Sequence, residues 1–483
     1  MNRKLYYLLI PFLIISCGKT FLDRDPTYYS NKTEAYSNIE SIQSALNGCY
    51  DGLQDYRYYG RNFYLMTEVS SDNAKLAYAN HNNFISFYNF ALTSSSTELD
   101  GFWKIGYKII SRANTIIDAT NKLNTVPYTE KRQILGEALA LRALVYFDLV
   151  RIFAQTNSIG AGVDSANFDG GHVGIPIITL PTTKDSLISP VRSSVKAVYN
   201  QIISDLLKAD TMLIPKQSVP YYFSSYSVKA LLAKVFLTKG SNSDLANANN
   251  YSSYLINLNE YDLVPNVDYI DSWNSSYTKE SIFSIPMTLT DNQGTNSIGY
   301  MLSKLGYGDL VSTQDLYDLF SENDIRKSLF KKGKDINIFK YPGRDKILGL
   351  DNVPIIRFSE MYLIKAEALV RLSFMDANKK NKDIYQNTAR LLLDTLRKRA
   401  DINAIPTNLV DNDLLELIYT ERRKEFMFEG QRFFDIKRRM IALKRNDCNA
   451  SVCTVNSPSY LFAFPIPVSE INANKNIKQN PNY

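Results

Sequence analysis

The chain has 483 residues, of which 45% are hydrophobic and 22% are charged. This composition is typical of a globular protein in water, and the length suffices for one large domain or for up to about three smaller ones. The formal net charge is only +6 and no lysine and arginine stripe stands out except a short run near Arg438, which argues against nucleic-acid binding.

The N-terminus has the layout of an export signal that ends in a cysteine. Arg3 and Lys4 precede an apolar run from Leu5 to Ile15, which is shorter than the roughly 20 residues that span a bilayer. The following Ser16-Cys17 resembles a bacterial lipobox, so residues 1–16 are predicted to be a lipoprotein signal peptide and Cys17 the lipidated residue. Residues 17–32 would form the tether. The alternative is an ordinary secretory signal that contains a cysteine.

The three other cysteines divide into one isolated residue and one pair. Cys49 lies in a helical pattern and is predicted to be a buried free thiol. Cys448 and Cys453 are separated by four residues in an apparent loop, and an exported protein can keep a disulfide there. Two unpaired loop thiols are the alternative to this bridge.

Helical periodicity dominates the chain and arrives in consecutive pairs. Apolar residues at three- and four-residue steps predict helices over 34–53, 98–123, 130–154, 193–213, 225–239, 244–258, 357–372, 384–400, 413–428 and 431–443. Antiparallel pairs repeating on this scale resemble tetratricopeptide-like stacking, although the strict repeat consensus is absent. The predicted fold class is therefore mainly α. Trp103, Leu139, Leu149, Tyr362 and Phe426 are expected in its core.

Three stretches lack this periodicity. Residues 56–90 are rich in tyrosine and asparagine and are predicted to be mostly loop, and the tail 461–483 has no helical pattern. Residues 261–353 combine Asn, Ser, Gly and Tyr with short β-like pieces such as 281–287. Because a structureless loop of that length is rare inside a compact domain, we expect an irregular, loop-rich subdomain built on a helical frame of about 33–260 and 354–445.

Several distinctive segments occur in order along nearly the whole chain. After the lipobox come Phe21-Leu22-Asp23 and then the segments 103–114, 137–153, 174–176, 357–368, 418–439, 465–467, 470–471 and 479–481. Together they resemble the RagB/SusD family of outer-membrane nutrient-binding lipoproteins of Bacteroidetes. Their order and spacing together make the resemblance specific. One departure is that Asn482 precedes the final Tyr483, where such proteins often end in Gly-Tyr.

This resemblance implies a fold, a location and partners. The fold is a tetratricopeptide-like helical domain over 33–483 with a variable loop-rich part. The location is the outer membrane, through a lipid anchor, with the protein facing the outside of the cell. The partners are an oligosaccharide or peptide ligand and a SusC-like TonB-dependent transporter that receives it.

Catalysis has little support in the sequence. Glu421 and Glu425 resemble the paired carboxylates of a glycoside hydrolase, but they are four residues apart on one helix, beside Arg422 and Arg423, which favours ion pairing. No Gly-x-Ser-x-Gly motif and no phosphate-binding glycine loop occurs. With only two histidines, a metal centre is not expected, and no cofactor is indicated.

Sugar binding needs flat aromatic faces beside amides and charged groups, and two stretches offer both. They are 72–83 and 273–307, with Tyr341 beside Arg344 as a further candidate, and they are expected to form one groove. For each aromatic residue the alternative is a place in the core or in a turn. The candidate ligand-binding residues are Tyr78, His81, Asn82, Asn83, Trp273, Tyr300, Tyr307 and Tyr341.

The leading hypothesis is therefore a surface lipoprotein that binds nutrients for a transporter. A surface glycoside hydrolase is a second hypothesis, which turnover of a bound glycan would distinguish. A helical-repeat scaffold that binds no ligand is a third, for which the loop aromatics would be dispensable. The sequence does not identify the ligand.

Overall fold

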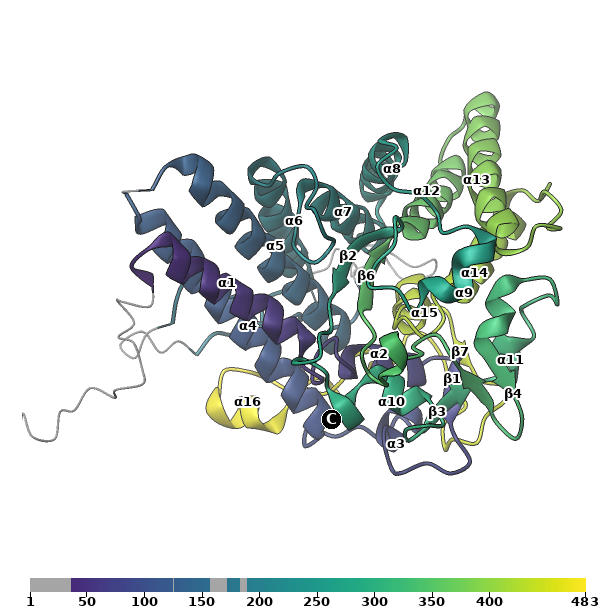
Figure 1. Ribbon diagram of the computed structural model, residues 1–483, viewed down its shortest axis with the longest axis horizontal. Helices are drawn as coiled ribbons and strands as arrows, with labels where there is room; N and C mark the ends of the chain where they lie inside the picture. The colour runs from purple at the N-terminus through teal and green to yellow at the C-terminus, as the bar shows by residue number, and fades with distance from the viewer. Residues whose placement is uncertain (1–35, 125, 157–171, 183–188) are drawn as a thin grey trace, which may run out of the picture.

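The computed structural model describes residues 36–124, 126–156, 172–182 and 189–483 (Figure 1). The predicted signal peptide, the lipidation site Cys17 and the tether 17–32 lie outside these ranges. No helix within the described residues is long and apolar enough to cross a membrane.

A curved row of paired helices forms the frame, as predicted (Figure 1). Each helix packs against its neighbour in the row, from α4 on α5 and α5 on α6 to α8 on α12 and α12 on α13. This arrangement confirms the mainly α, tetratricopeptide-like fold. The frame helices are α1 (Ile39–Gln54), α4 (Thr97–Lys122), α5 (Tyr128–Phe153), α6 (Val195–Met212), α7 (Ser225–Lys239), α8 (Asn242–Asn257), α12 (Phe358–Ser373), α13 (Lys379–Ala400) and α14 (Asp411–Glu425).

The α7–α8 hairpin shows how local sequence sets the pairing. Helix α7 ends at Gly240, whose φ of +80° is a left-handed conformation that suits glycine. The next residue, Ser241, already caps α8 by accepting a hydrogen bond from the Asp244 amide at 3.3 Å. Arg371 of α12 donates to the Gly240 carbonyl at 3.1 Å and so ties this hairpin to the next helix.

The core runs between these helices and follows the predictions closely. Leu139, Leu149, Phe426 and Trp103 are buried, and the indole N–H of Trp103 donates to Glu470. The predicted core residue Tyr362 is only half-buried, although it packs against the core. The core stabilises the fold because every apolar side chain withdrawn from water contributes roughly 1.5–3 kcal/mol.

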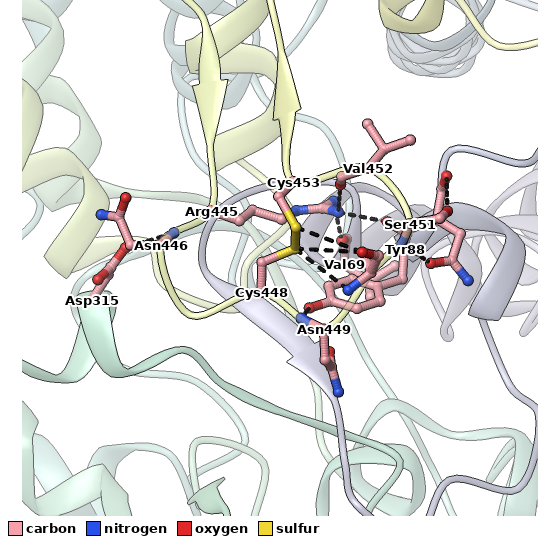
Figure 2. Close-up of a disulfide and its surroundings, with 12 residues drawn as sticks. Val69, Tyr88, Asp315, Arg445, Asn446, Cys448, Asn449, Ser451, Val452 and Cys453 are labelled. Carbon is pink, nitrogen blue, oxygen red and sulfur yellow. Dashed lines mark hydrogen bonds between the residues drawn. A yellow bond between two sulfur atoms is a disulfide. The ribbon is translucent and has the colours of Figure 1, made fainter.

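The predicted disulfide joins Cys448 to Cys453 (Figure 2). Cys49 is a buried free thiol, as predicted. The bridged loop connects strands β7 (Leu443–Lys444) and β8 (Thr454–Val455), which pair with each other. Arg445 extends from this hairpin and donates to the carbonyl oxygens of Val69 and Tyr88. The hairpin therefore fixes a distant segment of the chain.

The region 261–353 consists of short elements, as expected, and its ends are tied together. Strand β2 (Ser281–Ile285) pairs antiparallel with β6 (Val353–Arg357), which leads into α12. The short helices of this region are α9 (Tyr269–Ser272), α10 (Ile298–Leu302) and α11 (Gln314–Tyr317), with 3-10 turns at Asn266–Asp268, Gly294–Asn296, Ile325–Leu329 and Arg344–Lys346.

A four-stranded sheet joins this region to the first tyrosine-rich stretch. Its order is β1-β3-β5-β4, formed by β1 (Ala74–Leu76), β3 (Leu310–Ser312), β4 (Phe330–Lys332) and β5 (Ile336–Ile338). Ala74 lies opposite Ser312 and Leu76 opposite Leu310 in the antiparallel β1–β3 pair. The loop that leaves β1 therefore lies beside the loop that enters β3.

Two predictions of local structure need correction and a third needs detail. Residues 56–90 consist mostly of loops and turns, as predicted, but they also contain α2 (Asn62–Val69) and the short α3 (Ile85–Tyr88), and all eight residues of α2 are buried. Helix α15 (Arg432–Arg439) ends four residues before the predicted position, since Met440 adopts a left-handed φ of +52°. The tail contains the 3-10 turn Tyr460–Phe462 and the short helix α16 (Val468–Ala473).

Candidate functional site

Four of the predicted site residues come together next to the β1–β3 pair. The rings of His81 and Tyr307 have centroids 5.0 Å apart, and those of Tyr307 and Tyr300 also lie 5.0 Å apart, edge to face. Asn83 joins them through a shared partner described below. We call His81, Asn83, Tyr300 and Tyr307 the aromatic face.

A tight turn sets the two tyrosines side by side. The Tyr307 amide donates to the Tyr300 carbonyl at 2.9 Å, which closes the turn. At Gly306 a Cβ atom would lie 2.8 Å from the Tyr300 ring, so glycine is the residue that permits this close approach. Both rings are half-buried and each keeps part of its surface open to solvent.

Asp309 organises the loop that carries the histidine and the asparagines. Its carboxylate has no solvent exposure, and it accepts hydrogen bonds from the His81 amide at 2.9 Å and from the Asn83 side chain at 2.5 Å. His81 Nδ1 lies 2.7 Å from the same carboxylate, while 54% of the His81 side chain stays exposed. The buried Asp309 carboxylate thus holds the 81–83 loop in place, while the imidazole of His81 stays exposed to solvent.

An arginine platform lies next to this loop. Arg61 places its guanidinium 4.8 Å from the Tyr56 ring centroid and 5.6 Å from that of Phe84, and it donates to the Asn296 side chain at 2.9 Å. Burial lowers the pKa of Arg61 from its usual value, and only 9% of the residue is exposed. Arg61 therefore supports this surface, and planar rings beside amide groups are what recognition of sugar hydroxyls and C–H faces requires.

Two further predicted residues lie at the edge of this surface. Tyr78 is 77% exposed, and Lys334 places its ammonium 2.8 Å from the tyrosine ring centroid. Asn82 is exposed and has a left-handed φ of +68°, a conformation that asparagine tolerates better than most residues. Both stay candidates for contacts at the margin of the aromatic face.

The structure places Trp273 apart from the aromatic face, which divides the predicted groove. Its half-buried indole makes ring contacts with Tyr269 and Tyr341 and lies 4.4 Å from the Lys340 ammonium. It lines a small cavity of about 50 Å³ together with Tyr277. No residue of the aromatic face lines that cavity, and Figure 1 shows α9, which precedes Trp273, apart from α10, which carries Tyr300. Trp273 therefore does not share one groove with the 72–83 loop.

The assignment of Tyr341 as a ligand-binding residue is wrong. Its side chain is buried, and its hydroxyl donates to the Phe428 carbonyl at 2.9 Å. Burial raises the pKa of this phenol well above its usual value, so it stays neutral and serves as a hydrogen-bond donor inside the core. A buried ring cannot stack on a surface ligand.

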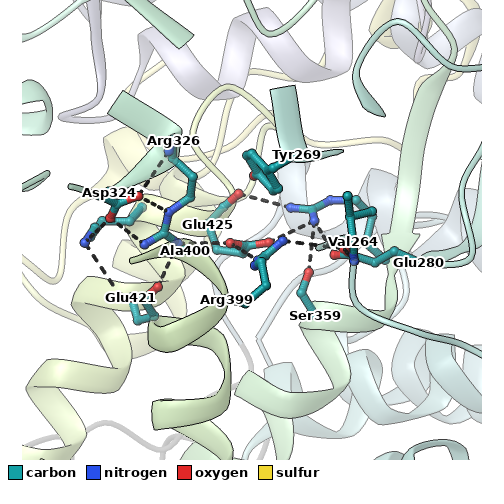
Figure 3. Close-up of polar contacts among 12 residues, drawn as sticks. Val264, Tyr269, Glu280, Asp324, Arg326, Ser359, Arg399, Ala400, Glu421 and Glu425 are labelled. Carbon is teal, nitrogen blue, oxygen red and sulfur yellow. Dashed lines mark hydrogen bonds and ion pairs between the residues drawn. The ribbon is translucent and has the colours of Figure 1, made fainter. Parts of the chain in front are cut away.

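The carboxylates that resemble a glycosidase pair belong to a buried ion network (Figure 3). Glu425 lies 3.0 Å from Arg326, 2.9 Å from Arg357 and 2.7 Å from Arg399, and Arg326 also pairs with Glu421 at 2.7 Å. Burial alone would raise the pKa of Glu425, but the three arginines outweigh it and hold the pKa well below its usual value. A permanently ionised carboxylate does not supply the proton that glycoside hydrolysis needs.

The described part of the chain also has no group of three or more His, Cys, Asp or Glu side chains that would hold a metal ion. Sequence reasoning missed Asp309, Arg61 and Tyr56. Tyr56 and Arg61 lie in the tyrosine-rich stretch, where an arginine among aromatic residues was an available signal. No signal in the sequence pointed to Asp309, because its role depends on contacts with residues more than 200 positions away.

Comparisons with known proteins agree with this architecture. The model of a SusD-like family, described as starch-binding and associating with the outer membrane, matches residues 20–237, and that of the SusD family matches residues 340–483. A SusD superfamily protein of Bacteroides thetaiotaomicron has a similar crystal structure, with a TM-score of 0.81 and 25% sequence identity over 92% of this chain and 100% of that one. The fold is that of a SusD-type binding protein.

Two curated relatives add sequence similarity. The SusD-like protein P2 of Formosa agariphila is 23% identical over 99% of both chains. The starch-binding protein SusD of Bacteroides thetaiotaomicron is 30% identical over 155 residues, which cover 31% of this chain and 24% of that protein. The chain belongs to the RagB/SusD family.

Proposed function

We propose that this protein captures oligosaccharides at the cell surface on the aromatic face and passes them to a SusC-like TonB-dependent transporter. A lipid on Cys17 holds it on the outer membrane. The observation that carries the proposal is the arrangement of His81, Tyr300 and Tyr307, whose rings are held in fixed positions yet remain partly open to solvent.

The chemistry of this surface favours a sugar over an apolar ligand. Tyrosine rings stack on the C–H faces of sugar rings, and the side chains of His81 and Asn83 beside them carry polar groups that can hydrogen-bond to hydroxyls. Because Asp309 already fixes the loop, little conformational entropy is lost when a ligand binds. The name of the relative SusD, a starch-binding protein, points the same way.

Binding without hydrolysis is part of the proposal. The glycosidase hypothesis relied on Glu421 and Glu425, which are buried and neutralised by arginines. The scaffold hypothesis predicts that the aromatic face is dispensable, and it gives no reason for an exposed imidazole that a buried carboxylate holds in place. We therefore assign the protein to ligand capture.

The test is binding of a panel of glycans and peptides by the purified protein, measured by affinity electrophoresis and calorimetry. The proposal predicts that at least one oligosaccharide binds and that its chain length is unchanged after prolonged incubation. If only peptides bind, the ligand is a peptide and not an oligosaccharide. Release of shortened glycans would support the hydrolase instead.

Anchoring and delivery have separate tests. Cys17→Ala should release the protein from the outer-membrane fraction and abolish incorporation of labelled fatty acid. A tagged wild-type protein should co-purify with a TonB-dependent transporter from gently solubilised membranes. Retention of the Cys17→Ala variant together with fatty-acid labelling would contradict the anchor, and purification without any transporter would contradict the partnership.

A further inference from the structure

A second concave surface lies away from the aromatic face, among the frame helices. It is a groove of about 440 Å³ whose walls come from the 216–224 loop between α6 and α7, the 259–262 segment after α8 and the 277–282 entry into β2. None of its lining residues belongs to the aromatic face. In Figure 1 the helices α6, α7 and α8 occupy the upper part of the molecule, whereas α3 and α10 lie in the lower part.

Two tyrosine rings face this groove and keep much of their surface free. Tyr222 is 39% exposed and Tyr277 is 46% exposed. Each ring packs against a neighbouring tyrosine. The ring centroids of Tyr222 and Tyr50 lie 5.1 Å apart, edge to face, and those of Tyr277 and Tyr221 lie 5.7 Å apart. Exposed rings held at their edges are suited to stacking.

The loop that carries Tyr222 is held by hydrogen bonds on both sides. The Phe223 amide donates to the Tyr50 hydroxyl at 2.9 Å, and the Ser284 amide of β2 donates to the Pro220 carbonyl at 2.8 Å. The groove therefore exists before any ligand arrives, and binding there would cost little ordering of the chain.

The charges at the groove cancel locally. Lys216 pairs with Glu260 at 3.2 Å, and Lys279 pairs with Asp262 at 3.1 Å. The remaining polar lining residues, such as Gln217 and Thr278, are uncharged. This balance suits a neutral ligand with many hydroxyls and disfavours a strongly charged one.

A smaller cavity adjoins the groove and carries unpaired donors. The 50 Å³ cavity beside Trp273 shares Tyr277, Thr278 and Ser281 with the groove. Among the described residues, the Tyr269 hydroxyl and the Trp273 indole N–H that line it are buried without a hydrogen-bond partner. Buried donors of this kind are usually completed by a hydroxyl or a water molecule.

We propose that the groove between Tyr222 and Tyr277 is a second carbohydrate-binding site, which takes a neutral stretch of a glycan. It rests on the proposed function and extends it, because a long glycan chain can then engage the aromatic face and the groove at once. Two linked contacts raise the overall affinity for a polymer well above that of either site, whereas a short oligosaccharide occupies only one.

The test compares four purified full-length proteins: the wild type, Tyr300→Ala/Tyr307→Ala, Tyr222→Ala/Tyr277→Ala and the quadruple variant. Soluble starch, xylan and galactomannan are the polymer probes, and trisaccharides of the same glycans are the short probes. A Tyr222→Phe/Tyr277→Phe variant keeps both rings and controls for the hydroxyls. Circular dichroism and melting curves show that each variant is folded.

We expect the groove variant to bind the polymer at least about tenfold more weakly than the wild type, while the trisaccharide still binds at the aromatic face. The phenylalanine control should bind like the wild type, and the quadruple variant should bind nothing. A groove variant with wild-type polymer affinity would overturn the second site, as would complete loss of all binding in Tyr300→Ala/Tyr307→Ala.

The remaining outcomes separate the two proposals. If only the groove variant loses binding, the second site stands and the aromatic face is wrong. If no glycan binds to the wild type, both the proposed function and the second site fail.

Discussion

The buried carboxylate of Glu425 in the helical frame pairs with buried arginines, whereas the buried carboxylate of Asp309 beside the aromatic face pairs with a histidine that stays exposed. Glu425 is fully buried and has three arginine partners. Its carboxylate thereby joins α14 to α13, to β6 and to the 3-10 turn Ile325–Leu329. His81 is anchored by Asp309 and still exposes half of its side chain. The same kinds of group thus serve structure in one region and, in our proposal, recognition in the other.

This difference shows that residue type and spacing alone do not identify a site. Glu421 and Glu425 have the composition of a catalytic pair, but both are buried and both are paired with arginines. The aromatic face has no pair of carboxylates, but its rings and its amide keep surface that a ligand can reach. A polar group whose hydrogen bonds and ion pairs are all made within the protein serves the fold. A polar group that keeps an open position can bind a ligand.

The largest effect should follow from breaking the buried network. Glu425→Gln leaves three arginines without their shared carboxylate, and we expect a loss of about 3–5 kcal/mol in the free energy of unfolding. Urea denaturation measures it. The matched control is Glu416→Gln, an exposed partner of Arg439, which should cost about 1 kcal/mol or less. Equal losses would show that the network is not a structural element.

The lowered pKa of Glu425 predicts that the folded protein loses stability in acid. The folded-state pKa of Glu425 lies below the unfolded value of 4.5, so its stabilising contribution is present above about pH 4.5 and is lost as the pH falls through the folded pKa. The wild type should lose this contribution on acidification, whereas Glu425→Gln lacks it at every pH.

The frame should also be sensitive to loss of apolar packing. Leu149 of α5 is buried against α4, where Gly106 leaves so little room that a Cβ atom would lie 3.3 Å from the leucine side chain. Leu149→Ala should therefore cost about 2–5 kcal/mol and lower the melting temperature. Leu391→Ala on the exposed face of α13 is the control and should stay within about 0.5 kcal/mol of the wild type.

A smaller and opposite pH effect is expected in the loop-rich region. Burial raises the pKa of Asp351 from 3.8 to about 7, although one of its oxygens accepts a hydrogen bond from the Gly343 amide. Because the folded pKa is the higher one, the stabilising contribution is complete below pH 3.8 and is lost as the pH rises through about 7.

Asp351→Asn removes this ionisation. At pH 8 the variant should be more stable than the wild type by about 1–3 kcal/mol, and at pH 5 the advantage should shrink. Thermal denaturation at both pH values measures the difference. A pH-independent gap between the two proteins would contradict the shifted pKa.

Much of the frame could be predicted from the sequence because its outer helices are amphipathic. Helix α7 is itself mostly buried, but its ends agree with the prediction of 225–239 because Ser224 and Gly240 are cap residues. Helix α2 was missed for the opposite reason: all of its residues are buried, so no polar face marks a helical period. Burial on every side removes the signal that periodicity needs.

The site was predictable only in part. Tyrosine and asparagine in loops pointed to His81, Asn83, Tyr300 and Tyr307, and the structure brings them together. The same rule failed for Tyr341, because a loop-like neighbourhood in sequence does not report that the ring is buried beneath other segments. Asp309 escaped notice because its partners are distant in sequence.

The most direct measurement of the central claim is the affinity of a responding oligosaccharide for Tyr307→Ala, Tyr307→Phe and Tyr128→Ala. Tyr128 is an exposed tyrosine at the start of α5 and controls for the loss of any surface ring. Calorimetry should show binding weakened by about 0.5–2 kcal/mol in Tyr307→Ala alone, with all three melting temperatures close to that of the wild type. Equal affinity of Tyr307→Ala and the wild type would contradict the assignment of the aromatic face as the ligand site.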